Sequence, residues 1–240
     1  ARDRFEIPEG IIYLDGNSLG PPPSGVFERH DEGRRSEWRA DLIGCRTKHG
    51  CIVLPVRVAG TMTVLFGGAP EEVAVADSTW VNIFKLLGAA LRLRPQRYAI
   101  VSERENFGTD LYIAQGMADL LGEKSELRLV DRSQITSALA DDVAVLMLTH
   151  VDFRSGEMHD MHGLTEAAHD AGALLQWDLA LSAVAVPVDL GTCGAAFAVG
   201  CGHKYLNGGP GAPAFAYVAR KHHDRLQTPL WGWMGHETPF

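Results

Sequence analysis

Membrane-spanning and secretory patterns are missing from this sequence of 240 residues, which has no run of eighteen apolar residues and no basic, apolar and small-residue series typical of a signal peptide. We therefore expect a soluble, cytoplasmic protein. Positive charge is scarce, because 22 lysines and arginines accompany 30 aspartates and glutamates, for a net charge of -8. This balance argues against a nucleic-acid-binding surface. The sequence also lacks a P-loop and a G-x-G-x-x-G turn after a strand, which argues against nucleotide binding.

Cysteine is rare as well: the chain has only Cys45, Cys51, Cys193 and Cys201, and no two of them have C-x-x-C spacing. We interpret all four as reduced thiols that act as small hydrophobic side chains, which predicts neither a disulfide framework nor a zinc site. Histidine is more common, and the His-Asp-Met-His sequence at 159–162 could chelate a metal from a helix. It has no evident third ligand, so we predict no metal site.

From about residue 72 onward, short apolar stretches alternate with helical patterns. The predicted strands are 72–76, 97–101, 126–130, 143–149, 174–177, 197–199 and 214–218. The predicted helices are 81–93, a helix that ends at 121, 133–140 and 161–171. Such alternation is typical of an α/β protein, and we expect a mostly parallel, seven-stranded-type sheet with helices on both faces.

The chain before residue 72 has a different character. Residues 1–25 are rich in turns, with a strand-like stretch at 11–14, and a charged helical pattern covers 26–42. A second helix is predicted at 57–66. Its apolar run from 56 to 66 would suit either a buried helix or a subunit contact.

Two apolar strands of the predicted sheet lead to a charged residue: 173–177 is followed by Asp178, and 195–201 by Lys204. Ligands of α/β sheets gather outside the carboxyl ends of the strands. A lone lysine at such an end most often extends its ammonium group to solvent. A desolvated lysine, however, has a lowered pKa and attacks carbonyl groups. The nearby carboxylate favours this second interpretation.

Two helix starts supply further groups. The helix that begins near Thr79 would offer free N–H groups and a positive dipole end to a phosphate, although an ordinary N-cap is equally compatible. Phe107 precedes a second helix start that contains Asp110, and its ring is either a stacking partner or a core residue.

A lysine, a carboxylate, an aromatic ring and an anion-binding helix start together describe a site for pyridoxal 5′-phosphate. This cofactor is a flat anionic aldehyde whose ring nitrogen pairs with a carboxylate.

Longer motifs extend through nearly the whole chain. They are Tyr13-Leu-Asp-Gly-Asn-Ser-Leu-Gly20, Ser102-Glu-Arg-Glu-Asn-Phe107, Thr109-Asp-Leu-Tyr-Ile-Ala-Gln-Gly116, Met158-His-Asp-Met161, Trp177-Asp-Leu-Ala180 and Lys204-Tyr-Leu-Asn-Gly-Gly-Pro-Gly211. These motifs resemble the bacterial kynureninase family of fold-type I pyridoxal-phosphate enzymes. The resemblance implies hydrolysis of L-kynurenine (or its 3-hydroxy form) to anthranilate (or 3-hydroxyanthranilate) and L-alanine, in tryptophan catabolism and NAD biosynthesis. It also implies a homodimer.

The resemblance assigns roles to individual residues. Lys204 would bind the cofactor covalently and act in catalysis, and Asp178 would pair with the pyridine nitrogen. The remaining cofactor-binding positions are Thr79 and Trp80 at the phosphate, Phe107 on the ring face, Gly108, Thr109 and Asp110 at the cofactor edge, Leu181 and His203 beside the two catalytic residues, and Trp233 reaching the phosphate from the neighbouring subunit.

Three of these positions depart from the family's usual residues. Leu181 stands where relatives have histidine, His203 where they have a tyrosine hydroxyl, and Trp80 where they have serine or threonine. Each lost phosphate donor would cost about 1–3 kcal/mol of cofactor affinity. A protonated His203 would still pair with phosphate.

On this basis we divide the chain into an N-terminal segment, 1–45, and a cofactor-binding large domain, 46–240. The sequence stops without a closing element, so we expect the family's C-terminal small domain to be absent from this chain and turnover to be low.

Two alternatives remain open. The altered Leu181 and the missing segment favour a degenerate relative that serves as a non-catalytic scaffold or dimerisation module, whereas the intact Lys204 and Asp178 favour an enzyme. The chain could also carry another fold-type I activity, such as that of an aminotransferase or a desulfurase. A desulfurase would need a cysteine in a loop beyond the lysine, and none of the four cysteines lies there.

Overall fold

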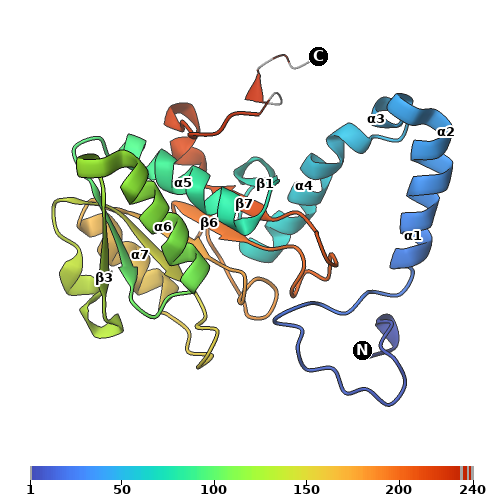
Figure 1. The fold of residues 1–240 in the computed structure, drawn as a ribbon, viewed down its shortest axis with the longest axis horizontal. Helices are drawn as coiled ribbons and strands as arrows, with labels where there is room; N and C mark the ends of the chain where they lie inside the picture. Colours follow the sequence, from blue (N-terminus) through green and yellow to red (C-terminus); the bar gives the residue numbers. More distant parts are fainter. Residues whose placement is uncertain (1, 233–234, 237, 239–240) are drawn as a thin grey trace.

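A seven-stranded sheet forms the centre of the computed structural model, which describes residues 2–232, 235–236 and 238 (Figure 1). The strands are β1 (Val73–Val75), β2 (Ala99–Glu103), β3 (Glu126–Val130), β4 (Val143–Thr149), β5 (Leu174–Asp178), β6 (Phe197–Gly200) and β7 (Phe215–Val218). Their order in the sheet is β1-β7-β6-β5-β4-β2-β3. The five strands from β6 to β3 pair in parallel, whereas β7 is antiparallel to both β6 and β1. The predicted α/β class with a mostly parallel sheet is confirmed.

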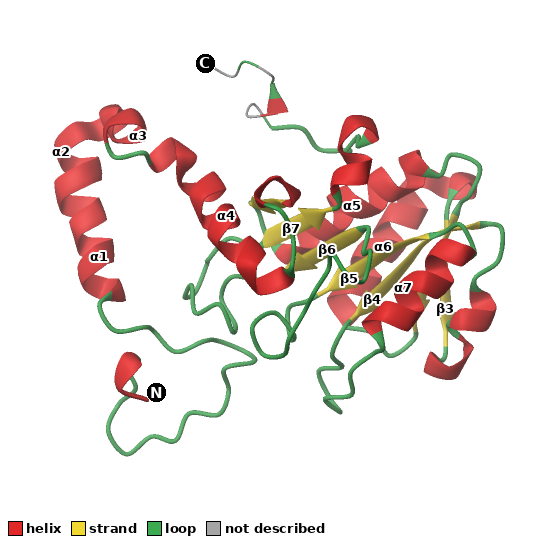
Figure 2. Ribbon diagram, turned by 180° about the vertical axis from the view of Figure 1, so that it is seen from behind, coloured by secondary structure: helices red, strands yellow, loops and turns green. Residues whose placement is uncertain are grey.

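Helices cover both faces of this sheet, as predicted (Figure 2). The four long helices are α4 (Leu54–Phe66), α5 (Thr79–Leu93), α6 (Gly108–Leu121) and α7 (Met161–Asp170). On one face, Leu87 of α5 and Met117 of α6 belong to a single buried apolar cluster. On the other face, α4 and α7 contribute to a second cluster, in which Phe66 stacks on Phe215 of β7 with ring centroids 4.7 Å apart. Burial on both faces explains why β4 is apolar from Val143 to Leu148.

Short helical turns complete the secondary structure. The 3-10 turns are Arg2–Arg4, Leu42–Gly44, Cys51–Val53, Pro70–Glu72, Gly122–Lys124, Arg132–Gln134, Thr136–Ala138 and Arg220–Arg225. Two of them replace the helix predicted at 133–140, so that prediction was wrong. The hydroxyl of Ser137 donates to the carbonyl oxygen of Gln134 at 2.9 Å. Such local side-chain bonds compete with a continuous helical ladder.

The N-terminal part forms an arm beside the sheet (Figure 1). It consists of α1 (Val26–Glu32), a π-helical turn at Gly33–Trp38, α2 (Arg39–Asp41) and α3 (Cys45–Lys48). The helix predicted at 26–42 is therefore present but interrupted. The strand-like stretch at 11–14 forms no strand, and its Ile12 and Leu14 are 83% and 86% exposed. Among the described residues no other strand forms a ladder with this stretch. A strand without a partner strand is not stable.

Only one side of α4 is covered by the rest of the chain. Ala59 and Phe66 are buried toward the sheet, whereas Val56 and Val64 are 72% and 86% exposed. Within the described residues, no single helix has the length and hydropathy to cross a membrane. The segments Val26–Lys48 and Cys51–Phe66 meet that criterion only when taken together, and they are bent by 61° at the break between them.

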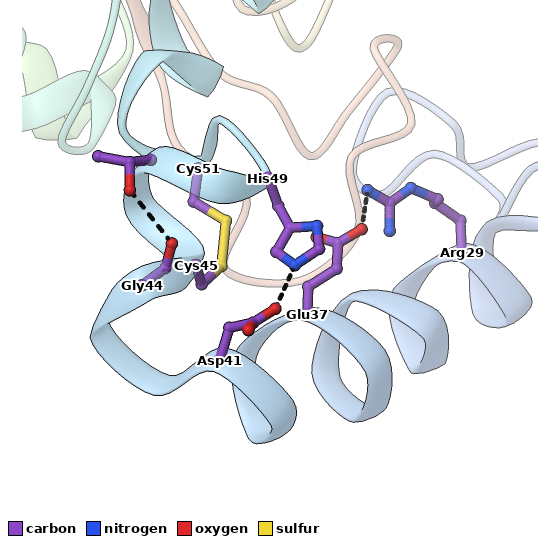
Figure 3. The surroundings of a disulfide bond; sticks show 8 residues. Arg29, Glu37, Asp41, Gly44, Cys45, His49 and Cys51 are labelled. Carbon is purple, nitrogen blue, oxygen red and sulfur yellow. Dashed lines mark hydrogen bonds and ion pairs between the residues drawn. A yellow bond between two sulfur atoms is a disulfide. The ribbon is translucent and has the colours of Figure 1, made fainter.

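The structure corrects the interpretation of the cysteines. Cys45 and Cys51 form a disulfide across this bend, with their Cα atoms 6.1 Å apart (Figure 3). Gly50, with a φ of 67°, reverses the chain between them. The prediction of a reduced thiol is therefore wrong for this pair. Cys193 and Cys201 are free, and Cys201 is buried.

Two buried histidines make folding stability sensitive to acid. His150 and His222 each have one ring nitrogen that is buried without a hydrogen-bond partner in the described part of the chain. Burial lowers the pKa of both to about 4, helped by the charge of His159 for His150 and that of Lys221 for His222. In the unfolded chain each takes up a proton near pH 6.5. Between pH 6.5 and 4 the unfolded state thus binds more protons, and the free energy of unfolding should fall by up to about 3 kcal/mol per histidine.

Urea denaturation followed by tryptophan fluorescence at pH 7 and at pH 5 measures this loss. A His222→Phe variant, whose ring would lie beside Phe197, should lose less stability between the two pH values than the parent. Replacing the exposed His30 by asparagine should leave the pH dependence unchanged. An unchanged pH dependence in His222→Phe would contradict the assignment.

Candidate functional site

A cavity of about 380 Å³ opens at the carboxyl ends of the parallel strands. This is the position at which α/β sheets bind ligands. Its lining residues come from the ends of β1, β4, β5 and β6 and from the starts of α5 and α6. They are Asp77, Ser78, Thr79, Trp80, Phe107, Asp110, Thr149, Asp178, Ala180, Leu181, Cys201, His203, Lys204, Gly211, Ala212 and Ala214.

Lys204 lies in the loop that follows β6 and is half-buried. Its Nζ atom is 5.8 Å from the centroid of the Phe107 ring. Within the described residues the ammonium group makes no hydrogen bond or ion pair with protein, so it is available to a ligand in the cavity.

The loop that carries Lys204 is held from two sides. The N–H of Asn207 donates to the carbonyl oxygen of Lys204 at 2.9 Å, and the N–H of Gly208 donates to that of Gly202 at 2.8 Å. From the N-terminal segment, the N–H of Gly20 donates to the carbonyl oxygen of His203 at 2.8 Å. A Cβ atom on residue 20 would lie 2.1 Å from the carbonyl oxygen of Lys204, so only glycine fits there.

Two carboxyl groups lie at the floor of the cavity. Asp178 at the end of β5 is 4% exposed, and its Oδ1 accepts a hydrogen bond from the N–H of Ala180 at 2.7 Å. Asp110 in α6 is 1% exposed and accepts a bond from the hydroxyl of Thr149 at 3.3 Å. The Oδ1 atom of Asp110 is buried and has no donor partner within the described residues.

Burial raises the pKa of both carboxyl groups, and the neighbouring charge of Asp178 raises that of Asp110 further. The pKa of Asp178 rises less, because Ala180, Asp110 and Lys204 all favour its charged form. Of the two groups, Asp110 is therefore the one that holds a proton more readily, and Asp178 is the one that more readily carries the negative charge beside the cavity.

The start of α5 forms another wall. Ser78 is the N-cap, and its hydroxyl oxygen accepts from the N–H of Val81 at 3.4 Å. The N–H groups of Thr79 and Trp80 are the first two of the helix and have no intrahelical acceptor. They can therefore bind an anion. The Trp80 side chain is 52% exposed at the cavity rim.

Phe107 is fixed by a buried polar network that the sequence did not reveal. The Oδ1 atom of Asn106 accepts from the N–H of Phe107 at 2.8 Å and from that of Thr149 at 3.2 Å. Its Nδ2 donates to the hydroxyl of Ser102 at 3.0 Å, and that hydroxyl donates to the carbonyl oxygen of Met147 at 2.7 Å. The network attaches the start of α6 to the end of β4.

Most of the predicted site residues meet in this cavity. Thr79, Trp80, Phe107, Asp110, Asp178, Leu181, His203 and Lys204 all line it. Gly108 and Thr109 are in the first turn of α6 but are not among the lining residues. Trp233 lies outside the described residues. Thr149 was missed, although its place at the end of a predicted strand could have identified it.

His203 is neutral at pH 7. Burial lowers its pKa below the ordinary value, and the charge of Lys204 lowers it further. A cationic His203 is therefore disfavoured until an anion enters the cavity.

The described residues fit pyridoxal phosphate. The unpartnered Oδ1 of Asp110 and the charged Asp178 suit a protonated ring nitrogen, the Phe107 ring offers a flat face near Lys204, and the start of α5 offers two N–H groups to a phosphate.

Comparison with known proteins gives matches along the whole chain. Residues 89–234 match the family model of aminotransferase class-V. The chain is 49% identical to the kynureninase of Burkholderia mallei and 51% identical to that of Deinococcus radiodurans, each over 244 residues that cover all of this chain and 59% of the relative. The chain thus spans about three-fifths of the length of these curated relatives.

Among solved structures, the chain resembles the apo cysteine desulfurase of Thermococcus onnurineus NA1, with 22% identity and a TM-score of 0.78 over 96% of this chain and 59% of that one. It also resembles a C-DES mutant with glycine covalently linked to its PLP cofactor, with 16% identity and a TM-score of 0.81 over 97% of this chain and 63% of that one. At these identities the likeness shows the fold alone.

Proposed function

Since the chain belongs to the aminotransferase class-V family, we propose that it is the cofactor-binding part of a kynureninase that uses pyridoxal phosphate. The reaction would hydrolyse L-kynurenine, or its 3-hydroxy form, to the corresponding anthranilate and L-alanine. The observation that carries the proposal is the meeting of Lys204, Asp178, Phe107 and the start of α5 around one cavity. The identity of about 50% to kynureninases supports the choice of substrate.

When bound, pyridoxal phosphate withdraws electrons from the carbon attached to the substrate amine and so eases bond breaking there. Lys204 would hold the cofactor covalently through its Nζ, and once released the same Nζ would accept the proton from the substrate carbon. Asp178 would offer its carboxylate to the ring nitrogen. Phe107 would orient the ring, and the N–H groups at the start of α5 would orient the phosphate.

Partners and location complete the proposal. We propose a cytoplasmic homodimer that serves tryptophan catabolism and NAD biosynthesis and binds neither nucleic acid nor membranes. The uncovered face of α4, with Val56 and Val64 exposed, supports a contact between two copies of the chain. The division into an N-terminal segment, 1–45, and a large domain, 46–240, is part of the same proposal.

A specific observation favours the alternative of a degenerate, non-catalytic relative. His203 is neutral and Leu181 is apolar where both line the cavity, so two sources of polar contact with a cofactor are weakened. The outcome depends on how tightly the site still holds pyridoxal phosphate.

Absorption spectroscopy followed by a fluorescence assay tests both readings. The purified chain, incubated with excess pyridoxal phosphate and then dialysed, should keep a visible absorption band. Added L-kynurenine should then give anthranilate fluorescence at a low rate. A chain that keeps no band would contradict cofactor binding and support the scaffold alternative. A retained band with no anthranilate from kynurenine or 3-hydroxykynurenine would instead point to another activity of the family.

A further inference from the structure

Outside the cavity, side chains of metal-binding type converge at the bend between the N-terminal arm and α4 (Figure 3). Cys45 is the first residue of α3, and Cys51 begins the 3-10 turn that precedes α4. Glu37 approaches them from the π-helical turn of the arm. A carboxylate oxygen of Glu37 and the two sulfur atoms all lie within 4.8 Å of one another.

These three groups suit a tetrahedral zinc site. In such a site Zn–S bonds are about 2.3 Å and Zn–O bonds about 2.1 Å, so the ligand atoms lie about 3.5–3.8 Å apart. The ligand atoms of the three side chains already lie within 4.8 Å of one another, and the two sulfurs can reach this spacing once the disulfide between them is reduced. Thiolate ligands select zinc over magnesium or calcium, which prefer oxygen.

A fourth ligand can come from His49, the C-cap residue of α3. Its Nε2 atom lies 2.6 Å from Oδ2 of Asp41, and the other oxygen of Asp41 accepts from Lys48 at 2.5 Å. Figure 3 shows the imidazole of His49 joined to Asp41 by this hydrogen bond. A carboxylate bonded to the far nitrogen of a metal-binding histidine is the usual outer-shell arrangement, because it fixes the orientation of the ring.

We propose that Cys45, Cys51, Glu37 and His49 form a redox-controlled zinc site, which is closed by the disulfide in the oxidised chain and binds one Zn²⁺ in the reduced chain. A dithiol reductant would supply two electrons and two protons, breaking the S–S bond to give two thiols while it becomes a disulfide itself. Zinc binding would then form two S–Zn bonds and release the two thiol protons to solvent.

The accessibility of the two sulfurs agrees with this order of events. Cys51 is half-buried and Cys45 is buried, so a thiol reductant reaches the bond from the side of Cys51. Cys45 and Cys51 are six residues apart and would be connected by the S–S bond in the oxidised chain and by the metal in the reduced chain. Both states would therefore stabilise the bend between the arm and α4.

Zinc titration of the whole chain against a chromophoric chelator tests the proposal. The reduced chain, freed of reductant under nitrogen, should bind one Zn²⁺ per chain, and the oxidised chain should bind none. Glu37→Gln should weaken binding by about 10- to 100-fold. The Cys45→Ser/Cys51→Ser variant should lose it, whereas Cys193→Ser is the matched control and should bind as the parent does.

Cobalt provides a readout that does not depend on the variants folding. Co²⁺ added to the reduced parent chain should give the near-ultraviolet charge-transfer absorption of thiolate ligation, and diamide oxidation should prevent it. A reduced chain that binds no Zn²⁺, a Co²⁺ complex without the thiolate band, or equal binding by the oxidised chain would each overturn the proposal.

Discussion

Replacing Lys204 by alanine should abolish the visible absorption band that the parent chain keeps after dialysis with pyridoxal phosphate, and turnover should fall below detection. The reason is chemical, because Lys204 is the amine that lines the cavity and lies over the Phe107 ring. Without it no covalent bond to the aldehyde forms. Absorption spectra before and after dialysis, together with anthranilate fluorescence, measure both effects.

The fold should survive this substitution. The ammonium group of Lys204 makes no hydrogen bond or ion pair within the described residues, so its removal leaves no buried partner unsatisfied. Lys221→Ala is the matched control, because Lys221 is exposed and distant from the cavity lining. That variant should keep the band. A band that persists in Lys204→Ala after dialysis would mean that another amine holds the cofactor.

Asp178→Asn should lower turnover by about 100-fold or more, the size typical of removing a preorganised electrostatic partner. Asparagine keeps the shape of the side chain and can still accept from the N–H of Ala180. It removes the negative charge that would hold a proton on the pyridine nitrogen. Steady-state turnover at saturating pyridoxal phosphate separates this effect from weaker cofactor binding.

Asp110→Asn is the matched comparison, because it changes the other member of the same carboxyl pair. Burial and the neighbouring charge of Asp178 raise the pKa of Asp110 and so favour its protonated, neutral form. An amide there removes no charge and still donates to Asp178, so turnover should fall about tenfold at most, the effect of weakening one hydrogen bond without losing it. A larger loss in Asp110→Asn than in Asp178→Asn would show that the charge resides on Asp110.

The strand pattern and the rule of carboxyl strand ends were sufficient to predict where the cavity lies. Lys204 and Asp178 follow neighbouring parallel strands, β6 and β5, and parallel pairing brings their carboxyl ends together. Strands that are buried on both faces appear in the sequence as short, continuous apolar runs, and such runs can be recognised without a structure.

Two other contacts could not be predicted from strand or helix patterns. The Cys45–Cys51 pair depends on a chain reversal at Gly50, and the Asn106 network depends on the approach of β4 to the start of α6. Neither leaves a periodic pattern in the sequence. The helix predicted at 133–140 was wrong for a different reason. The hydroxyl of Ser137 bonds to the backbone of Gln134, and helix propensity does not include such a local hydrogen bond.

Gly20 has a consequence for the design of shorter fragments. Among the described residues, those that line the cavity all fall between Asp77 and Ala214, so a fragment that starts at residue 46 would contain this lining. It would nevertheless lack Gly20. The N–H group of Gly20 donates to the carbonyl oxygen of His203, and its backbone, without a side chain, lies against the carbonyl oxygen of Lys204. The smallest piece that preserves the geometry of the reactive lysine is therefore discontinuous in sequence. The peptide around Gly20, supplied separately, is the component that such a fragment would need.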